Sequence, residues 1–456
     1  MPILKRNLLT LLTSLLLANT LLLSGCSWGF KVTSDNDSLL TNEELSLKIM
    51  YDYDEQQFYN QYGTLFASKF PNINLEVMNT QLIESSAELT DEEVYSFIEK
   101  EKPDVLLLSM NQYEQLANEG KLYDLEQLFA QSDYDLNGIH PAIIKLIRDQ
   151  SFGKLFGLAP TFESKALIYN VDLFEKYNID PPTDSMSWKE IIEKAKLFTT
   201  EQHDVYGFSA PMYSTYADFA YSIALTSGLS MLNEKKTEVL LQTDSWRQVF
   251  QSTLDAANSD SILFPSSQDS LSTMQDYYNS DPFISGKLAM KLINPYELQS
   301  FAEARQVVGE EQMPSWELVS APVEANNRSQ SKEFHIQKVY AIYAGSTNIE
   351  AAWEFIQYIH SSEFARIQAK IPYSELLQSQ TAFIPDIFGV SMEPFYKLEP
   401  GERTDPLDGT IEDFKYNAIS IIEDELQNVL NNVKSLEDAI IDMETRAKAQ
   451  LDQSKQ

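Results

Sequence analysis

Apolar and polar residues recur with two different periods along this chain, and the two periods predict alternating strands and helices. Residues 45–51 alternate between apolar and polar as a strand does, whereas residues 58–70 carry apolar side chains at helical spacing up to Pro71. Two further apolar runs predict strands at 73–78 and 104–109, and the second run is continuous, as in a buried parallel strand. This alternation favours an α/β fold with a mostly parallel sheet.

The same alternation resumes near Leu155 and continues toward the C-terminus. Ser187 and Glu190 fit a capping box, so a helix is expected from there to about Phe198. Further strands are expected at 288–293, 316–322 and 339–343, a helix at 351–359, and two charged helices between about 411 and 451. The length of 456 residues favours about two or three domains for these elements.

The N-terminus has the order of features found in a secretory signal. Lys5 and Arg6 precede an apolar stretch at 8–23, and small residues then lead to Cys26, the only cysteine of the chain. A retained transmembrane anchor is the alternative, but the stretch is short for a span. We expect a signal peptide at residues 1–25 and a flexible polar tether at 26–45.

The charge and cysteine counts exclude several classes of protein. Asp and Glu number 68 against 34 Lys and Arg, and the net charge of −34 leaves no basic surface to neutralise nucleic-acid phosphates. A single cysteine excludes an intramolecular disulfide framework and a thiolate zinc cluster. HExxH, GxSxG and glycine-rich nucleotide-binding motifs are missing from the sequence. We therefore expect no cofactor, no metal site and no nucleic-acid partner.

One short segment matches half of a calcium-binding loop. Asp133, Asp135, Asn137 and Gly138 have the spacing of its first positions, but Ile144 stands where a bidentate glutamate is needed. A polar turn is the favoured interpretation, because calcium would require a distant carboxylate to complete its shell.

Candidate binding residues follow the ends of predicted strands. Asp52, Tyr53 and Asp54 come directly after the first strand, and Ser109 ends the third. In open α/β sheets ligands bind beyond the carboxyl ends of strands, where carboxylates accept hydroxyl hydrogen bonds and tyrosines offer apolar faces. A solvated turn that caps the next helix is the alternative for these positions. The aromatic stretch 213–221 also offers contacts, although core packing is its commoner role.

Five segments taken in their order and spacing resemble one family. They are KPDVLLLS at 102–109, GKLFGLAPTFESKALIYNVDLFEKYNIDPP at 153–182, SWKEIIEKAKLF at 187–198, FISGKLAMKLINPY at 283–296 and AGSTNIEAAWEFIQYI at 344–359. With these segments the chain resembles the extracellular solute-binding proteins of ABC transporters, in the maltose-binding-like group that carries sugars. Leu23-Ser24-Gly25-Cys26 likewise resembles the lipobox of bacterial lipoproteins, in which the cysteine is diacylated.

The resemblance implies an α/β periplasmic-binding-protein type II fold, with two hinged lobes and a ligand cleft between them. It places the N-terminal lobe at residues 46–160 and 294–340 and the C-terminal lobe at 161–293 and 341–456. Crossings between lobes are expected near 160–163, 293–295 and 339–345. Residues 377–408 have no counterpart that can be placed.

Ligand contacts follow from the same resemblance. It implies a glutamate contact at Glu163, an aromatic that stacks on sugar at Tyr296, and ligand-facing aromatics at Tyr216 and Phe219. The first-lobe loop would add polar contacts from Asp52 and Asp54. Asn-Pro-Tyr at 294–296 replaces the Gly-Pro-Trp of maltose binders, so the resemblance gives a class of ligand and not one sugar.

The expected function is that of a monomeric substrate-binding lipoprotein on the extracytoplasmic face of the cell membrane. It would be anchored through Cys26, bind a sugar or oligosaccharide without chemical change, and deliver it to ABC permease subunits. One alternative is a sensory binding lipoprotein that presents its ligand to a membrane receptor. The other is an extracellular glycan-hydrolysing enzyme that uses paired carboxylates.

Overall fold

A computed structural model describes residues 45–83, 90–132, 134–199, 204–211, 214–265, 273–370, 377–401, 406–407 and 412–453. The expected signal peptide, the tether and the lipid-bearing Cys26 lie outside these residues. Within them, no helix has both the length and the apolar character needed to cross a membrane.

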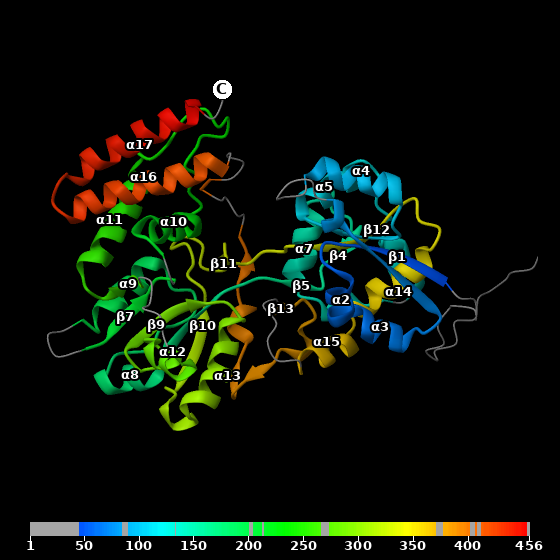
Figure 1. Cartoon of the computed structure of the whole chain (residues 1–456), viewed down its shortest axis with the longest axis horizontal. Coiled ribbons are helices and arrows are strands. Elements are labelled where there is room, and N and C mark those ends of the chain that lie inside the picture. Colours follow the sequence, from blue (N-terminus) through cyan, green and yellow to red (C-terminus); the bar gives the residue numbers. More distant parts are fainter. Residues whose placement is uncertain are drawn as a thin grey trace, which may run out of the picture. The chain divides into compact units, whose positions relative to one another are not determined.

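The first sheet contains the three strands expected early in the chain (Figure 1). Its order is β2 (Ile73–Asn79), β1 (Leu45–Tyr51), β3 (Val105–Leu108), β12 (Val339–Ile342) and β4 (Gly157–Leu158). β1 pairs in parallel with β2 and β3, whereas β12 is antiparallel to β3 and β4. The carboxyl ends of β1, β2 and β3 therefore meet at one edge, as the sequence predicted.

Helices that pack with this sheet begin at strong caps. Thr90 and Ser109 each form a capping box, with Glu93 and Gln112 respectively, and so fix where two of these helices start. The helices are α2 (Glu55–Phe58), α3 (Thr64–Lys69), α4 (Asp91–Glu101), α5 (Met110–Asn118), α6 (Glu126–Ser132), α7 (Pro141–Asp149), α14 (Ile349–Ile359) and α15 (Ser362–Gln368).

The second sheet is more mixed than the sequence predicted. Its order is β10 (Trp316–Ser320), β6 (Ala166–Asn170), β9 (Leu288–Ile293), β7 (Tyr206–Ser209) and β8 (Ile262–Leu263). β7 is parallel to β8 and β9, but β6 is antiparallel to both of its neighbours. The expectation of a mostly parallel sheet is wrong for both sheets, because β12 in the first and β6 in the second are each antiparallel to both of their neighbours.

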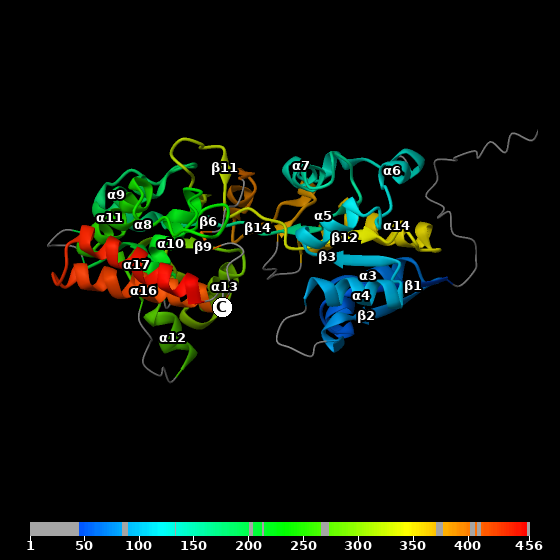
Figure 2. The ribbon, with the colours of Figure 1, turned by 90° about the horizontal axis from the view of Figure 1, so that it is seen from above.

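The second sheet has its own set of helices. The capping box of Ser187 and Glu190 is confirmed and begins α9. The helices are α8 (Val171–Tyr177), α9 (Trp188–Lys196), α10 (Tyr216–Thr226), α11 (Asp244–Asn258), α12 (Met274–Ser280), α13 (Glu297–Val308), α16 (Glu412–Leu430) and α17 (Leu436–Gln453). α16 and α17 lie side by side, and α16 contacts α10 and α11 (Figure 2).

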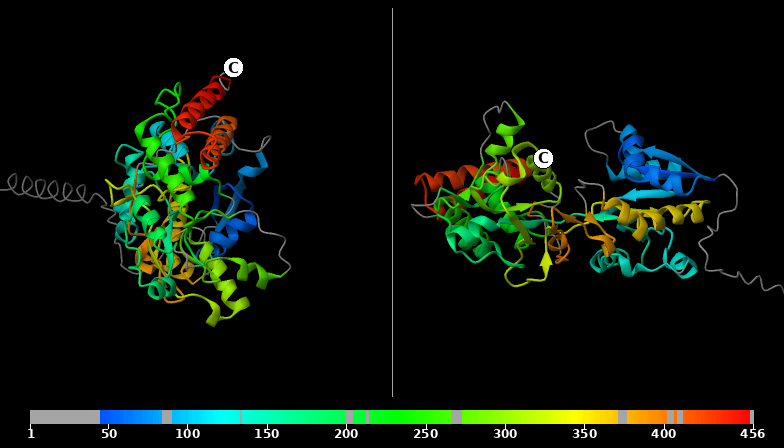
Figure 3. Two further views of the ribbon diagram at one scale, coloured as in Figure 1. Left: turned by 90° about the vertical axis from the view of Figure 1, so that its left-hand side faces the viewer. Right: turned by 90° about the horizontal axis from the view of Figure 1, so that it is seen from below.

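The described chain passes between the two sheets by three routes. It leaves β4 for β6 through β5 (Thr161–Phe162), and it returns from β10 to β12 through residues 321–338, which include β11 (Gln330–Ser331). The third route contains β13 (Leu377–Gln378), β14 (Asp386–Ile387), β15 (Val390–Ser391) and β16 (Glu399–Pro400). β13 pairs with β5 and β16 pairs with β11, so this segment, orange in Figure 3, runs along the other two routes.

Strand pairing differs from the expected division of the chain after residue 293. Residues 294–340 were expected in the first lobe, yet β10 pairs with β6 of the second sheet. Residues 341–456 were expected in the second, yet β12 belongs to the first sheet and α14 packs on it. Ile293 still pairs within the second sheet, so the chain does not return to the first sheet there. The return route lies at 321–338, between the last paired residue of β10 and the first of β12. We propose that the N-terminal lobe comprises 45–160 and 339–370.

Candidate functional site

Two of the three routes between the sheets are joined at one antiparallel bridge. There Glu163 and His335 exchange backbone N–H···O bonds of 2.8 and 3.0 Å, and we call residues 161–165 and 333–337 around this bridge the ribbon. Successive side chains of an extended strand point to opposite faces. Even-numbered positions of the ribbon therefore share one face and odd-numbered positions share the other.

The even-numbered face is aromatic and buried. The rings of Phe162 and Phe334 stack with centroids 4.5 Å apart, and His140 and Tyr396 pack around them. His140 Nε2 lies 3.0 Å from the Tyr396 carbonyl oxygen. Burial raises the pKa of Tyr396, so its hydroxyl stays protonated. This packing anchors the ribbon to α7 and to the third route, which leaves the odd-numbered face for polar groups.

The odd-numbered face carries Glu163, the glutamate predicted to contact a ligand. His335 Nε2 lies 2.6 Å from Glu163 Oε2, and Gln337 Nε2 donates a hydrogen bond to Glu163 Oε1. The Glu163 and His335 side chains remain 28% and 30% exposed. On the next rung of the ribbon, Lys165 Nζ lies 2.9 Å from Glu333 Oε2. Glu163 is thus a held, accessible hydrogen-bond acceptor.

The candidate binding residues of the first lobe lie at the carboxyl ends of the strands. Two of them are accessible to a ligand, and two cap helices. Asp52 forms a 2.6 Å ion pair with Lys338, which arrives from the ribbon, and Tyr53 is 46% exposed. Asp54 instead caps α2 by accepting the Gln57 N–H, and Ser109 caps α5. Capping explains these last two side chains, whereas Asp52 and Tyr53 keep groups that a ligand can reach.

Three tyrosines, Tyr51, Tyr62 and Tyr340, lie near Asp52. Tyr51 donates a 2.8 Å hydrogen bond to Gln61 Oε1, and Tyr62 and Tyr340 are buried beside it. Burial first, and then the neighbouring Asp52 and tyrosines, raise the pKa of all three tyrosines. These phenols therefore remain protonated across the physiological pH range.

The second-lobe aromatics also have different environments. Phe219 is 1% exposed and packs against Trp188, so core packing accounts for its ring. The helical periodicity of α10 turns it toward the core. Tyr216, at the first turn of α10, is partly buried and meets Phe264 edge-on at 4.6 Å. Tyr296 follows β9 at the start of α13 and is 45% exposed.

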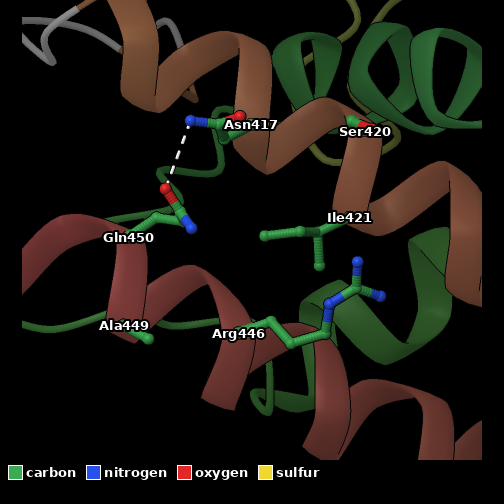
Figure 4. Close-up of a pocket in the computed structure, with 6 residues that line it drawn as sticks. All are labelled: Asn417, Ser420, Ile421, Arg446, Ala449 and Gln450. Atoms are coloured by element: carbon green, nitrogen blue, oxygen red, sulfur yellow. Dashed lines mark hydrogen bonds between the residues drawn. The ribbon is translucent and has the colours of Figure 1, made fainter. Parts of the chain in front are cut away.

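A separate hollow of about 270 Å³ lies between α16 and α17 (Figure 4). Asn417 donates a 3.2 Å hydrogen bond to Gln450 across it, and Arg446 is already paired with Asp424 at 2.9 Å. Its lining contains no residue predicted as a site: Asn417, Ser420, Ile421, Arg446, Ala449 and Gln450. We assign it to the packing of the helical hairpin.

Within the part of the chain that the structure describes, no three or more His, Cys, Asp or Glu side chains gather as a metal site. Asp135 accepts the Asn137 N–H in a short turn, in keeping with the favoured interpretation of that segment. Asp133 lies outside the described residues.

The family follows from a comparison with known proteins. A family model for the bacterial extracellular solute-binding proteins matches residues 52–365, and the chain belongs to that family. Members of this family bind solutes outside the cytoplasm, as the family's description states. No curated protein matches the chain.

Solved structures with two lobes share the fold. The sugar-binding protein MalE of Xanthomonas citri aligns with a TM-score of 0.61 at 15% identity, over 90% of this chain and 98% of the other. A Rhizobium etli sugar transporter in an open conformation gives 0.57 at 16%, over 89% and 99%. An ABC substrate-binding protein of Listeria monocytogenes in complex with cycloalternan gives 0.50 at 18%, over 90% and 100%.

Sequence alone did not indicate which side chains pair with the predicted carboxylates. His335, Gln337 and Lys338 hold Glu163 and Asp52, but none was a candidate. A signal was present, because residues 333–337 alternate polar and apolar as an amphipathic strand does. That pattern predicts a strand with one polar face, although it does not say which carboxylates the face would meet.

Proposed function

We propose that this chain is the substrate-binding protein of an ABC importer, which captures a sugar or oligosaccharide between its lobes and delivers it to a membrane permease. The family membership supports a solute-binding role. Proteins described as sugar-binding or bound to an oligosaccharide share the fold. The ligand would favour a closed arrangement of the lobes in proportion to its higher affinity for that arrangement.

The charge balance of the candidate site is the observation that carries the ligand class. Glu163 already has His335 and Gln337 as partners, and Asp52 already has Lys338. A site for a cationic ligand needs carboxylates without such partners, since the ligand would otherwise have to displace them. Paired but accessible carboxylates suit a neutral ligand, whose hydroxyl groups add charge-assisted hydrogen bonds of about 1.5–3 kcal/mol each.

Exposed aromatic rings support the same ligand class. Tyr53 and Tyr296 are nearly half exposed at the strand ends of the two lobes. Their rings offer flat apolar faces for the C–H surface of a sugar, and their hydroxyls remain free to meet polar groups. In this proposal Asp52, Glu163, Tyr53 and Tyr296 are the principal contacts, and Tyr216 is a secondary one.

The proposed anchor and location follow from the N-terminal sequence. Cleavage before Cys26 and attachment of one lipid group with two acyl chains to its thiol would hold the protein on the extracytoplasmic face, because two acyl chains give stable membrane binding. We propose that the protein acts as a monomer and releases its ligand unchanged.

Isothermal calorimetry against a panel of neutral mono- and oligosaccharides, amino acids and peptides tests the ligand class. We expect saturable binding of at least one sugar, with the sugar recovered intact. Saturation by an amino acid or peptide and by no sugar would overturn the proposed class. Recovery of a cleaved sugar would instead favour the hydrolytic alternative.

A further inference from the structure

The His335 ring is held in an unusual way on the polar face of the ribbon. Its Nε2 atom lies 2.6 Å from Glu163 Oε2. Its Nδ1 atom is buried and has no hydrogen-bond partner. Buried polar atoms are nearly always satisfied, so an orphaned ring nitrogen needs an explanation. The contact between Nε2 and Glu163 holds the ring in the orientation that leaves Nδ1 without a partner.

The different surroundings of the two ring nitrogens fix the tautomer of the ring. The lone pairs of a bare Nε2 and a carboxylate oxygen would repel at 2.6 Å, so Nε2 must carry a proton. In the neutral ring Nδ1 is then bare. A proton on Nδ1 would be a buried donor without an acceptor. Of the two tautomers of the neutral ring, the geometry therefore selects the one with its proton on Nε2.

Gln337 completes the arrangement from the same strand. Its side chain lies two residues beyond His335 and donates to Oε1, the other oxygen of the Glu163 carboxylate. Each oxygen of Glu163 thus has one donor, and the backbone bonds between Glu163 and His335 fix the spacing of the two strands. A carboxylate held at both oxygens cannot rotate freely and keeps its remaining lone pairs in fixed directions.

We propose that His335 and Gln337 are positioning residues, which lock the Glu163 carboxylate in one orientation and so set the affinity for a hydroxyl-bearing ligand. This inference rests on the proposed function of Glu163 as a ligand contact. Neither residue needs to touch the ligand. Their contribution is to reduce the conformational freedom that Glu163 would otherwise lose on binding.

A ligand-free measurement tests the positioning itself. Nitrogen-15 NMR of the histidine rings in the full mature chain reports the tautomer, and His335→Gln assigns the signal by its loss. We expect His335 to carry its proton on Nε2, and we expect the Nε2 resonance to shift in Glu163→Gln because the charged acceptor is lost. A proton on Nδ1, or an Nε2 resonance that is indifferent to Glu163→Gln, would overturn the proposal.

A binding series measures the consequence, with a sugar that saturates the wild-type protein in calorimetry as the probe. His335→Leu and Gln337→Leu should each weaken binding by about tenfold or more. His335→Gln keeps a donor near the Nε2 position, so the hydrogen bond to Glu163 is retained. This variant should bind the sugar within about threefold of wild type. Lys165→Gln breaks the neighbouring ion pair of the ribbon and is the matched control, which should bind like wild type.

The two arms separate failure of this inference from failure of the proposed function. Wild-type affinity in His335→Leu, or equal losses in His335→Gln and His335→Leu, would show that the ring has no positioning role. If no sugar saturates the wild-type protein, the proposed function fails, and the tautomer measurement still decides whether the ring holds Glu163.

Discussion

At the scale of single residues, exposure separates the aromatic candidates that sequence alone could not distinguish. Phe219 is fully buried beside Trp188, whereas Tyr296 is 45% exposed after β9. Both were expected to contact a ligand, because aromatic side chains occur in binding sites as well as in cores. A core ring contributes to the free energy of unfolding, while an exposed ring at a strand end is available to a ligand.

This difference predicts opposite effects of two substitutions. Phe219→Ala should lower the free energy of unfolding by about 3–5 kcal/mol, because it leaves a cavity in the second-lobe core. Tyr296→Ala should change that free energy by less than about 0.5 kcal/mol, as surface substitutions do, and weaken sugar binding. Urea unfolding and calorimetry measure the two quantities. Equal stability losses in both variants would contradict the assignment.

Sequence alone indicated some residues of the candidate site but not the partners that hold them. Glu163 was inferred as a ligand contact from a local motif, and this role stays a prediction. Its donor Gln337 is 174 residues away along the chain, and no local pattern specifies a contact over that distance. Asp54 and Ser109 show the opposite case, because a cap and a binding residue look alike in sequence.

At the scale of elements, the beginning of α9 shows how a local signal and a distant partner combine. Ser187 and Glu190 form the predicted capping box, and Arg328 pairs with the Glu190 carboxylate through both of its terminal nitrogens. The Arg328 hydrogen bonds, followed by those from Ser187, lower the pKa of Glu190 to about 2.

The lowered pKa of Glu190 predicts an acid-dependent contribution to stability. A carboxyl whose pKa is lower in the folded state stabilises the fold above its unfolded pKa, near 4.5, and this contribution is lost as the pH falls toward about 2. Glu190→Gln should therefore lose less stability than wild type over that range. Urea unfolding at a series of pH values tests this, and parallel curves for the two proteins would contradict it.

The C-terminal hairpin depends on a buried carboxylate. Glu425 on α16 is 2% exposed and lies 2.6 Å from Lys434 and 2.8 Å from Arg446. Burying a carboxylate is costly unless it is paired, so the two cations are needed wherever Glu425 is ionised. The expected charged helices at 411–451 are confirmed, but the sequence did not show that one of their charges points inward.

This pairing predicts that removing the cations is worse than removing the whole network. Lys434→Met with Arg446→Met should lower the free energy of unfolding by about 3–5 kcal/mol, because Glu425 stays buried without a partner. Adding Glu425→Gln to the double variant should recover much of that loss. Thermal or urea unfolding measures both, and a triple variant no more stable than the double variant would contradict the explanation.

At the scale of the whole molecule, the local elements were predicted better than the path between them. The strands of the first lobe and the helices with capping boxes carry periodic signals, so they could be found from sequence. The return route at 321–338 has no long apolar run, because only alternate residues of a ribbon face the core. Its position became clear only from strand pairing, which is the basis of the lobe boundary that we propose.

Residues 377–400, which could not be placed from sequence, belong to this same path. β13 pairs with β5 on the outward route, and β16 pairs with β11 on the return route. The third segment thus runs along both earlier ones, where Tyr396 covers the stacked Phe162 ring. We infer that motion between the lobes would involve all three routes together.

Small-angle X-ray scattering of the mature chain, with and without a saturating neutral sugar, tests the central account most directly. Because the sugar would favour a closed arrangement of the lobes, we expect a smaller radius of gyration in its presence. We also expect full reversal after dialysis and recovery of the sugar intact. A radius of gyration that stays constant at saturation, or a sugar recovered in cleaved form, would contradict it.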